Sequence, residues 1–467
     1  MIVKLNPYSA WKLRSAVWFA LAAPFLSAQS LVIKNISVVD VAAGSVKTPA
    51  DVVIKDGKIA SIDAKSSPAD ATAVDGSGKY LIPGLWDMHV HNWEKTSLYG
   101  LYVANGVLGI RDTGSNRAMT RHWQEQVKAG EIIGPRLVTS GPIVDGPGPN
   151  NYPKLPVETI ATPADVPMVV DRLMQSGSDF IKPLSRLDRD SYFALLKYAK
   201  ERHIVVAGHV PSAISVWEAV RAGQHSVEHM QMLPLACSTE EPEIRQEMAE
   251  AATKKDREAT RRLRQRVAET YSQEHCTALF QEMKKLNAWI DPTFVSGWLR
   301  WRIATGEAQK DPNVRFVPEY LRTEWADPSN SEGPPTPAQQ EQERKDEEAR
   351  KKMVLAMKTA EVGILTGSDT GDPYVLPGFV VHQEMALLVE YGLSPAEALR
   401  ASTLEPARYF GTTASEGTVE RGKNANLVIV AANPLADISN TRRVDAVVLR
   451  GKLLKRDQLD ALLKDPK

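Results

Sequence analysis

Six residues that could take part in binding a metal ion each end a short apolar run of the chain. They are His89, His91, Lys182, His209, His229 and Asp369. Imidazole nitrogens and carboxylate oxygens are common ligands of divalent metals. Three imidazoles make one plausible metal site, and four imidazoles with two oxygen donors make two. If the fold brings these residues together, the set predicts a hydrolase that uses two metal ions.

The first two histidines stand two residues apart, at the end of the run LIPGLWDMHVH. In a strand, residues two apart point to the same side, so His89 and His91 would direct their imidazoles at one point. Such pairs also occur without a metal, and this pair alone is weak evidence. The pair supports a metal site only in combination with the other four residues.

Lys182 is an unusual residue at the end of the apolar run SDFIK. Burial disfavours the charged ammonium group and lowers the pKa of a lysine. A neutral amine can take up carbon dioxide and become a carbamate, whose two oxygens can bridge two cations. The alternative is a lysine whose ammonium group reaches solvent.

His209, His229 and Asp369 end the runs HIVVAGH, QHSVEH and VGILTGSD. Each has a structural alternative when taken singly. Either histidine could be a core residue, His229 could pair with its neighbour Glu228, and Asp369 could cap a helix. The order of the six residues favours the metal site, because all of them fall at strand ends on one predicted face.

Between residues 85 and 410, short apolar runs alternate with amphipathic segments such as DRDSYFALLKYAKERH. This alternation predicts a parallel sheet with helical crossovers, the α/β class. Eight runs are candidate strands, and eight fit a closed (β/α)8 TIM barrel, whose active site lies at the carboxyl ends of the strands. Strands one, four, five, six and eight would supply the six residues.

Strand-like runs with Asp-Gly and Gly-Lys turns flank this region on both sides. We expect residues 29–84 and 411–460 to form one small β-sandwich domain beside the barrel of residues 85–410. The segment at about 237–288 is mostly charged and favours helix, as does a second polar segment before the last strand. We expect a peripheral helical insert on the active-site face that could cap the pocket.

The charge balance and the cysteines exclude some classes of protein. The chain has 57 basic and 57 acidic residues, and a net charge of zero argues against nucleic acid as a partner. Cys237 and Cys276 are too few for a disulfide framework. We expect two buried free thiols, with a pairing of the two cysteines as the alternative.

The N-terminus has the features of a signal peptide, which we place at residues 1–28. Lys4, Lys12 and Arg14 precede an apolar stretch that is too short to span a bilayer, and small residues follow it. We expect cleavage near Gln29, a secreted or periplasmic protein, and no stable membrane span after cleavage. A short retained anchor is the alternative.

In its motifs the chain resembles the amidohydrolase superfamily. The motifs are PGLWDMHVH, FIKP, AGHV, SVEH and LTGSD, and the likeness covers nearly the whole chain after the signal peptide. AGHVP followed by AGQHSVEH makes it similar to the prolidase-like and imidazolonepropionase-related branch, which contains dipeptidases and ochratoxinase-type amidases. The resemblance implies a barrel with two divalent metal ions, most often Zn²⁺, and a carboxylated lysine.

The resemblance also implies a role for each residue. One metal ion would be held by His89, His91 and Asp369, and the second by His209 and His229. Lys182, as a carbamate, would bridge the two ions together with a hydroxide. Asp369 would also be the catalytic proton acceptor.

One position departs from the family pattern. Some peptidase members carry a tyrosine soon after the fifth-strand histidine, and this chain has Val210-Pro211-Ser212 there. The residues that bind the substrate are not identified by the sequence. Arg300 or Arg302, after strand seven, could hold a carboxylate, or could be surface charges on a helix.

We expect an exported enzyme that hydrolyses an amide or peptide-like C–N bond by a metal-activated hydroxide. Its substrate would be a small molecule such as an N-acyl amino acid or a dipeptide-like compound. The sequence is compatible with a homo-oligomer as well as with a monomer. One alternative is a mononuclear cyclic-amide hydrolase, imidazolonepropionase-like, or a deaminase, which would bind one metal ion per chain. The other is a non-catalytic exported metal-binding protein.

Overall fold

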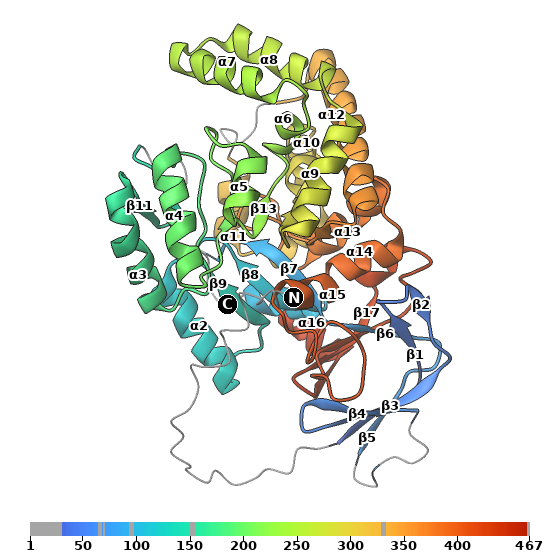
Figure 1. The fold of residues 1–467 in the computed structure, drawn as a ribbon. Coiled ribbons are helices and arrows are strands. Elements are labelled where there is room, and N and C mark those ends of the chain that lie inside the picture. The colour runs from blue at the N-terminus through green and yellow to red at the C-terminus, as the bar shows by residue number, and fades with distance from the viewer. Residues whose placement is uncertain are drawn as a thin grey trace.

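Parallel strands lie at the centre of this computed structural model, and helices pack around them (Figure 1). The structure describes residues 30–63, 68, 71–92, 98–148, 155–327 and 333–464, so the predicted signal peptide lies outside the described residues. The central strands are β7 (Leu85–Val90), β8 (Val107–Asp112), β9 (Arg136–Thr139), β12 (Ala207–Gly208), β13 (Ser226–Glu228), β14 (Trp289–Asp291) and β15 (Gly363–Ile364). They form two parallel sheets, β7-β8-β9 and β12-β13-β14-β15.

Backbone hydrogen bonds link these two sheets on both sides. Residues 179–183 lie between β9 and β12, where Asp179 N donates to Thr139 O over 2.7 Å and Ile181 forms a parallel bridge with Val206. Beyond β15, Val90 forms a parallel bridge with Thr370. All eight predicted runs therefore take part, and the fold is TIM-barrel-like.

The covering helices share one apolar core with the strands. They are α1 (Tyr99–Ala104), α2 (Arg117–Ala129), α3 (Val166–Ser176), α4 (Arg189–Glu201), α5 (Val216–Ala222), α9 (Gln273–Lys285), α12 (Pro337–Ala360), α13 (Phe379–Glu390), α14 (Pro395–Ala401) and α15 (Leu404–Tyr409). Polar residues fix where several of them begin. In α5, for example, Ser215 and Glu218 form a capping box that satisfies backbone N–H groups of the first turn.

Strands from both ends of the chain form one nine-stranded sheet, whose main order is β18-β17-β16-β6-β1-β3-β4. Its strands are β1 (Leu31–Asp40), β2 (Ser45–Val46), β3 (Ala50–Lys55), β4 (Lys58–Ile62), β5 (Thr72–Asp75), β6 (Tyr80–Pro83), β16 (Leu427–Val430), β17 (Val444–Leu449) and β18 (Lys452–Lys455). β6 pairs with β16, and one residue, Gly84, separates β6 from β7. The two ends of the chain thus meet beside the first barrel strand, while their closure into a sandwich stays a prediction.

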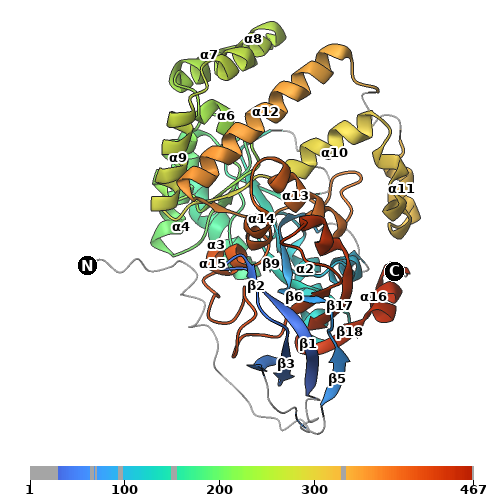
Figure 2. The ribbon, with the colours of Figure 1, turned by 90° about the vertical axis from the view of Figure 1, so that its right-hand side faces the viewer.

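Part of the predicted insert projects from the barrel as a helical hairpin. We call α7 (Glu241–Lys254) and α8 (Arg257–Glu269) the α7–α8 hairpin, which lies at the top of Figure 2. It has its own small apolar cluster, which includes Ile244 and Leu263. Short α6 (Leu233–Ala236) precedes it. The predicted helical character is therefore confirmed for this part of the insert.

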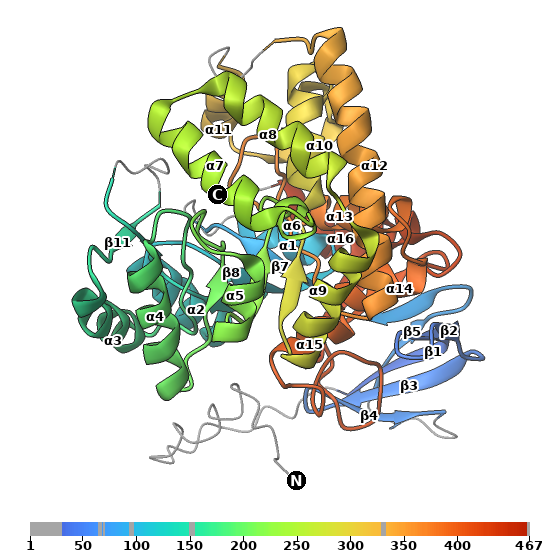
Figure 3. The same cartoon turned by 45° about the horizontal axis from the view of Figure 1, so that its top comes forward.

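The prediction that the whole insert is peripheral is wrong for α9. This helix buries Cys276, Leu279, Phe280 and Met283 in the main core and packs against α12 (Figure 3). These positions have the i, i+3, i+4, i+7 spacing of an amphipathic helix that faces a core. α9 is thus a helix of the barrel layer, and only the α7–α8 hairpin stands outside.

The prediction of free thiols is also wrong, because Cys237 and Cys276 form a disulfide. Residues at the base of the α7–α8 hairpin pair with each other, with an antiparallel bridge between Ser238 and Tyr271. This pairing brings the Cα atoms of the two cysteines to 4.4 Å, within the range that a disulfide spans.

Two further helices follow β14 in the chain, α10 (Phe294–Ala304) and α11 (Glu319–Trp325). Glu384 of α13 accepts hydrogen bonds from the backbone N–H groups of Phe294 and Val295, over 3.0 and 2.7 Å, and so fixes the start of α10.

In the part of the chain that the structure describes, no helix combines the length and the apolar composition needed to cross a bilayer.

Candidate metal centre

The fold brings the predicted site residues together at one end of the central strands. Lys182 Nζ lies 3.3 Å from His89 Nε2. Asp369 Oδ1 lies 3.4 Å from Nε2 of both His89 and His91, and its Oδ2 lies 3.8 Å from His229 Nδ1. These contacts join four different strand ends at one point, as the sequence predicts.

His209 completes the group from the side of the fifth strand. Its ring centroid lies 4.9 Å from that of His229, whose ring in turn lies 4.6 Å from that of His89. Lys182 and His89 are fully buried, whereas His209 and His229 are partly exposed. The centre therefore has solvent contact at His209 and His229.

His229 and Asp369 reach this point through an unusual backbone conformation. Their φ angles are 63° and 60°, in the left-handed region that residues other than glycine seldom adopt. Hydrogen bonds hold both turns: His229 N donates to Asp291 O and Asp369 N to His89 O, each over 2.8 Å. Such strain is typical of positions where a side chain must point in one fixed direction.

Each of the four imidazoles has a partner for its Nδ1 atom outside the centre. The pairs are His89 with Glu228 Oε2 at 2.9 Å, His91 with Gly114 O at 3.3 Å, His209 with Ser185 Oγ at 2.9 Å, and His229 with Thr293 Oγ1 at 2.6 Å. A metal-binding histidine needs such a partner, because it fixes the ring and leaves the Nε2 lone pair for the ion. This arrangement fits four imidazole ligands.

The charges in the centre also suit a cation. Burial lowers the pKa of His89, His209 and His229, with a further effect of nearby Lys182, and so disfavours the charged form of these imidazoles. Burial opposes ionisation of Asp369, but the surrounding imidazoles outweigh it and hold its pKa well below the usual range. Burial lowers the pKa of Lys182 to about 8, so its amine is far easier to deprotonate than an exposed one.

Beneath the centre lies a group of buried charges that the sequence did not reveal. Arg111, from β8, donates from Nη2 to Glu228 Oε2 over 2.7 Å and to Asp291 Oδ2 over 3.3 Å. Its Nη1 donates to Ser226 Oγ and to Tyr409 OH. His89, Glu228 and Asp291 lie close enough together to suggest a second metal site, but Arg111 already supplies a cation there, and burial raises the pKa of Asp291 well above its usual range. The one signal in the sequence was a charged pair, Arg111-Asp112, at the end of an otherwise apolar strand.

The spacing and protonation of the candidate ligands fit a divalent metal ion. One ligand atom each from His89, His229 and Asp369 lies within 4.8 Å of the others. Neutral imidazoles and an ionised carboxylate are the forms that bind divalent ions. Lys182 adds a buried nitrogen beside them, in a place where a free ammonium group would be costly.

The two arginines considered for substrate binding differ in their surroundings. Arg302 pairs with Glu307 over 2.7 Å and covers the ring of Trp298, so it has a structural role. Arg300 is exposed on α10, and its charge acts on the carboxyl of Asp372, which is also exposed. Part of the loop after strand three, residues 149–154, lies outside the described residues.

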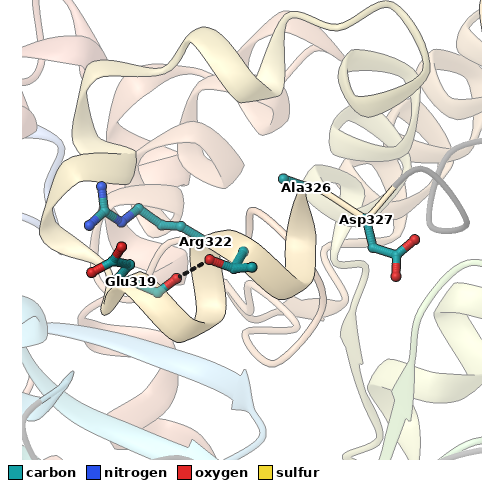
Figure 4. A pocket seen from close by; sticks show the side chains of 5 residues that line it. Glu319, Arg322, Ala326 and Asp327 are labelled. Atoms are coloured by element: carbon teal, nitrogen blue, oxygen red, sulfur yellow. Dashed lines mark hydrogen bonds between the residues drawn. The ribbon is translucent and has the colours of Figure 1, made fainter.

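A wide hollow in the described part of the molecule lies away from this centre. It lies along α11 and is lined by Glu319, Arg322, Thr323, Ala326 and Asp327 (Figure 4). It is a wide, open depression, and the one hydrogen bond drawn there joins Thr323 to Glu319 within the helix. None of the six predicted residues lines it, so its size carries no functional argument.

Comparison with known proteins agrees with this geometry. The Amidohydrolase family model matches residues 103–454, a range that includes Lys182, His209, His229 and Asp369 but begins after His89 and His91. A dihydroorotase from Pelotomaculum thermopropionicum is 51% identical over 61 residues, which are 13% of this chain and 14% of the dihydroorotase. The chain thus matches only a small part of the length of that curated relative.

Solved structures match the fold over much more of the chain. The bottromycin amidohydrolase AH is 23% identical, with a TM-score of 0.69 over 93% of this chain and 88% of its own. A Xaa-Pro dipeptidase with bound methionine in its active site is 20% identical, with a TM-score of 0.64 over 91% of this chain and 100% of its own. At these identities the likeness shows the fold alone. Since the family model covers more than half of the 467 residues, the chain belongs to the amidohydrolase family.

Proposed function

We propose that the chain is a metal-dependent hydrolase of amide or peptide-like C–N bonds in small molecules, with two divalent metal ions, most simply Zn²⁺. The observation that carries the proposal is the convergence of four imidazoles, Asp369 and a fully buried Lys182 at one end of the strands. Family membership and amidohydrolase and dipeptidase neighbours support the same bond type.

Lys182 favours two ions over one. A single ion needs only imidazole and carboxylate ligands, and a buried ammonium group 3.3 Å from His89 Nε2 would repel it. As a carbamate, Lys182 would instead supply negative charge and two oxygen ligands. We therefore propose that Lys182 is carboxylated, with His89, His91 and Asp369 on one ion and His209 and His229 on the other.

Bound metal ions would supply a hydroxide at neutral pH and polarise the scissile carbonyl. Asp369 is placed to accept a proton at one carboxylate oxygen, because its two oxygens face three imidazoles from two strand ends. It would then return that proton to the leaving nitrogen, as a general acid. Glu228, Gly114, Ser185 and Thr293 would keep the four rings oriented while the proton moves.

The proposal is tested by metal content and hydrolysis measured on the same samples. Purified protein supplied with zinc and bicarbonate should contain two metal ions per chain and hydrolyse members of a panel of N-acyl amino acids and dipeptides. His209→Asn should lower the metal content, whereas His122→Asn, at an exposed position outside the centre, should not. One ion per chain with activity on cyclic amides alone would contradict the two-metal proposal. Two bound ions without hydrolysis of any panel member would contradict the enzymatic one.

Export is a separate part of the proposal. The disulfide between Cys237 and Cys276 supports it, since disulfides persist in oxidising compartments. Intact-mass analysis of protein recovered from the periplasm or the medium should show the loss of about the first 28 residues. Full-length protein confined to the cytosol would contradict it.

A further inference from the structure

The residue at the start of α10 does not use its side chain in the usual way. Thr293 stands at the N-cap position, where a threonine hydroxyl normally accepts a hydrogen bond from a backbone N–H group of the first turn. Within this helix, all of which the structure describes, its side chain makes no such bond. Its Oγ1 lies instead 2.6 Å from Nδ1 of His229. The hydroxyl thus serves a candidate metal ligand and leaves the helix without its ordinary cap.

Glu384 of α13, 90 positions after Phe294, supplies the missing cap. Its Oε1 accepts a hydrogen bond from the N–H of Phe294 over 3.0 Å, and its Oε2 accepts one from the N–H of Val295 over 2.7 Å. Glu384 and Val295 are fully buried, so loss of this acceptor would leave buried N–H groups unpaired, which is costly. Burial raises the pKa of Glu384 to about 8, and the two N–H groups act in the opposite direction by favouring the ionised form.

We propose that Glu384 is a positioning residue of the metal centre, and that it acts on His229 through Thr293. Because Glu384 caps α10, the hydroxyl of Thr293 is left to orient the imidazole of His229. The inference rests on the proposed function, because it concerns a ligand of the same centre. It extends that centre to a helix that supplies none of the six candidate ligands.

The backbone of Thr293 supports this division of roles. Its φ and ψ angles are 47° and 46°, in the left-handed region that a β-branched residue rarely adopts. Thr336, by contrast, caps α12 with its own side chain and has the usual extended backbone, with φ −67° and ψ 159°. Without Glu384, Thr293 would gain by adopting that extended conformation and capping α10 itself. Its hydroxyl would then no longer meet His229.

Metal affinity, measured by competition between the zinc-loaded protein and a chelator, tests the proposal. Glu384→Gln replaces one accepting oxygen by an amide nitrogen that cannot accept a hydrogen bond. We expect the affinity for the ion held by His209 and His229 to fall by about 10- to 100-fold, as after loss of an outer partner of a metal-binding histidine. Thr293→Val removes the hydroxyl at nearly constant shape and should have at least as large an effect. Thr293→Ser retains the hydroxyl and should stay near the wild type.

A double variant separates positioning from a general loss of stability. If Glu384 acts through Thr293, Glu384→Gln should not lower the metal affinity of a Thr293→Val protein any further, because the intermediate hydroxyl is already gone. Glu397→Gln is the matched control. Glu397 accepts from the backbone N–H of Ser394 over 2.7 Å at the start of α14, so its loss should lower the melting temperature and leave the metal affinity unchanged. Unchanged affinity in Glu384→Gln, additive losses in the double variant, or an equal loss in Glu397→Gln would overturn the proposal.

A measurement on the metal-free protein keeps this test apart from the proposed function. Nitrogen-15 NMR of histidine-labelled protein reports the state of each ring, and the signals of His229 are identified by their absence in His229→Gln. We expect the Nδ1 signal of His229 to move in Glu384→Gln in the same direction as in Thr293→Val. If the protein binds no metal, the proposed function fails, but this signal still decides the role of Glu384. A signal that stays in place in Glu384→Gln would overturn the inference. If Glu384→Gln does not fold, Glu384→Asp, with its carboxyl group on a shorter side chain, replaces it in both measurements.

Discussion

Replacing Arg111 by methionine should destabilise the protein and weaken metal binding together. The guanidinium is fully buried and donates to Glu228, Asp291, Ser226 and Tyr409. Methionine fills much of the same volume but carries no charge. The change therefore leaves two buried carboxyl groups without their cation, while it creates only a small cavity.

The size of the effect follows from the pairing. Removing one partner of a buried ion pair costs about 3–5 kcal/mol. For a chain of this length we take the low end of the scale, about 2 °C per kcal/mol, so the melting temperature should fall by about 6–10 °C. Glu228 also holds Nδ1 of His89, and without Arg111 this carboxylate is no longer fixed in position. We expect metal affinity to fall by at most the roughly 10- to 100-fold that follows loss of such an outer partner.

Two measurements separate these effects. Differential scanning calorimetry of the metal-free protein gives the stability change, and competition with a chelator gives the metal affinity. Arg262→Met is the control, because Arg262 forms an exposed pair with Glu258 and its loss should change neither quantity. Adding Glu228→Gln to Arg111→Met should recover part of the stability by removing an unpaired charge. A melting temperature within about 1 °C of the wild type, outside the range above, would refute the reasoning.

Three further changes probe other parts of the molecule. Lys182→Ala should lose metal and turnover, and acetate or propionate should restore part of both by supplying a carboxylate; a variant that retains two ions contradicts the carbamate bridge. Replacing residues 240–269 by a short linker should leave a folded barrel, judged by circular dichroism and a cooperative melt, whereas a deletion that extends through α9 should not fold. Burial lowers the pKa of His382 to about 3, so the stability that its neutral form contributes is complete above about pH 6.5 and is lost as the pH falls towards 3. His382→Gln should therefore flatten this part of the profile of melting temperature against pH, relative to the wild type. Parallel profiles of the two proteins would contradict this pKa assignment.

The strand ends were predictable because each lies at a change of pattern. A strand leaves the apolar core where its sequence turns from aliphatic to polar, and His89, Lys182, His209, His229 and Asp369 stand at such changes. Parallel topology then places all carboxyl ends on one side. Six separate residues could be assembled from periodicity and chain order alone, without knowledge of any distance.

Other features depend on which strands become neighbours in space, and no local pattern records that. Glu228 was considered as a partner of its sequence neighbour His229, but it bonds His89, which is 139 positions away. The bonds from Arg111 to Glu228 and Asp291 likewise join three different strands. The position of α9, in contrast, could have been predicted from its local sequence pattern. Its buried positions, 276, 279, 280 and 283, have the spacing of a helix that faces a core. The prediction placed α9 at the surface because the segment before it, the α7–α8 hairpin, is highly charged.

The junction at Gly84 has a consequence for how the protein acquires its active form. β6 is held by β16, with Pro83 opposite Leu427, and Gly84 N donates to Asn426 O just before β7 begins. β7 contains His89 and ends one residue before His91, so the first two candidate ligands are anchored by residues more than 300 positions later in the sequence. A chain that emerges N-terminus first, from a ribosome or a translocation channel, cannot fix this strand until almost all of it has appeared. Contacts of such long range form late in folding. If the centre binds metal as proposed, it should do so late in maturation, and C-terminally truncated chains should be poor in metal even when all six candidate ligands are present.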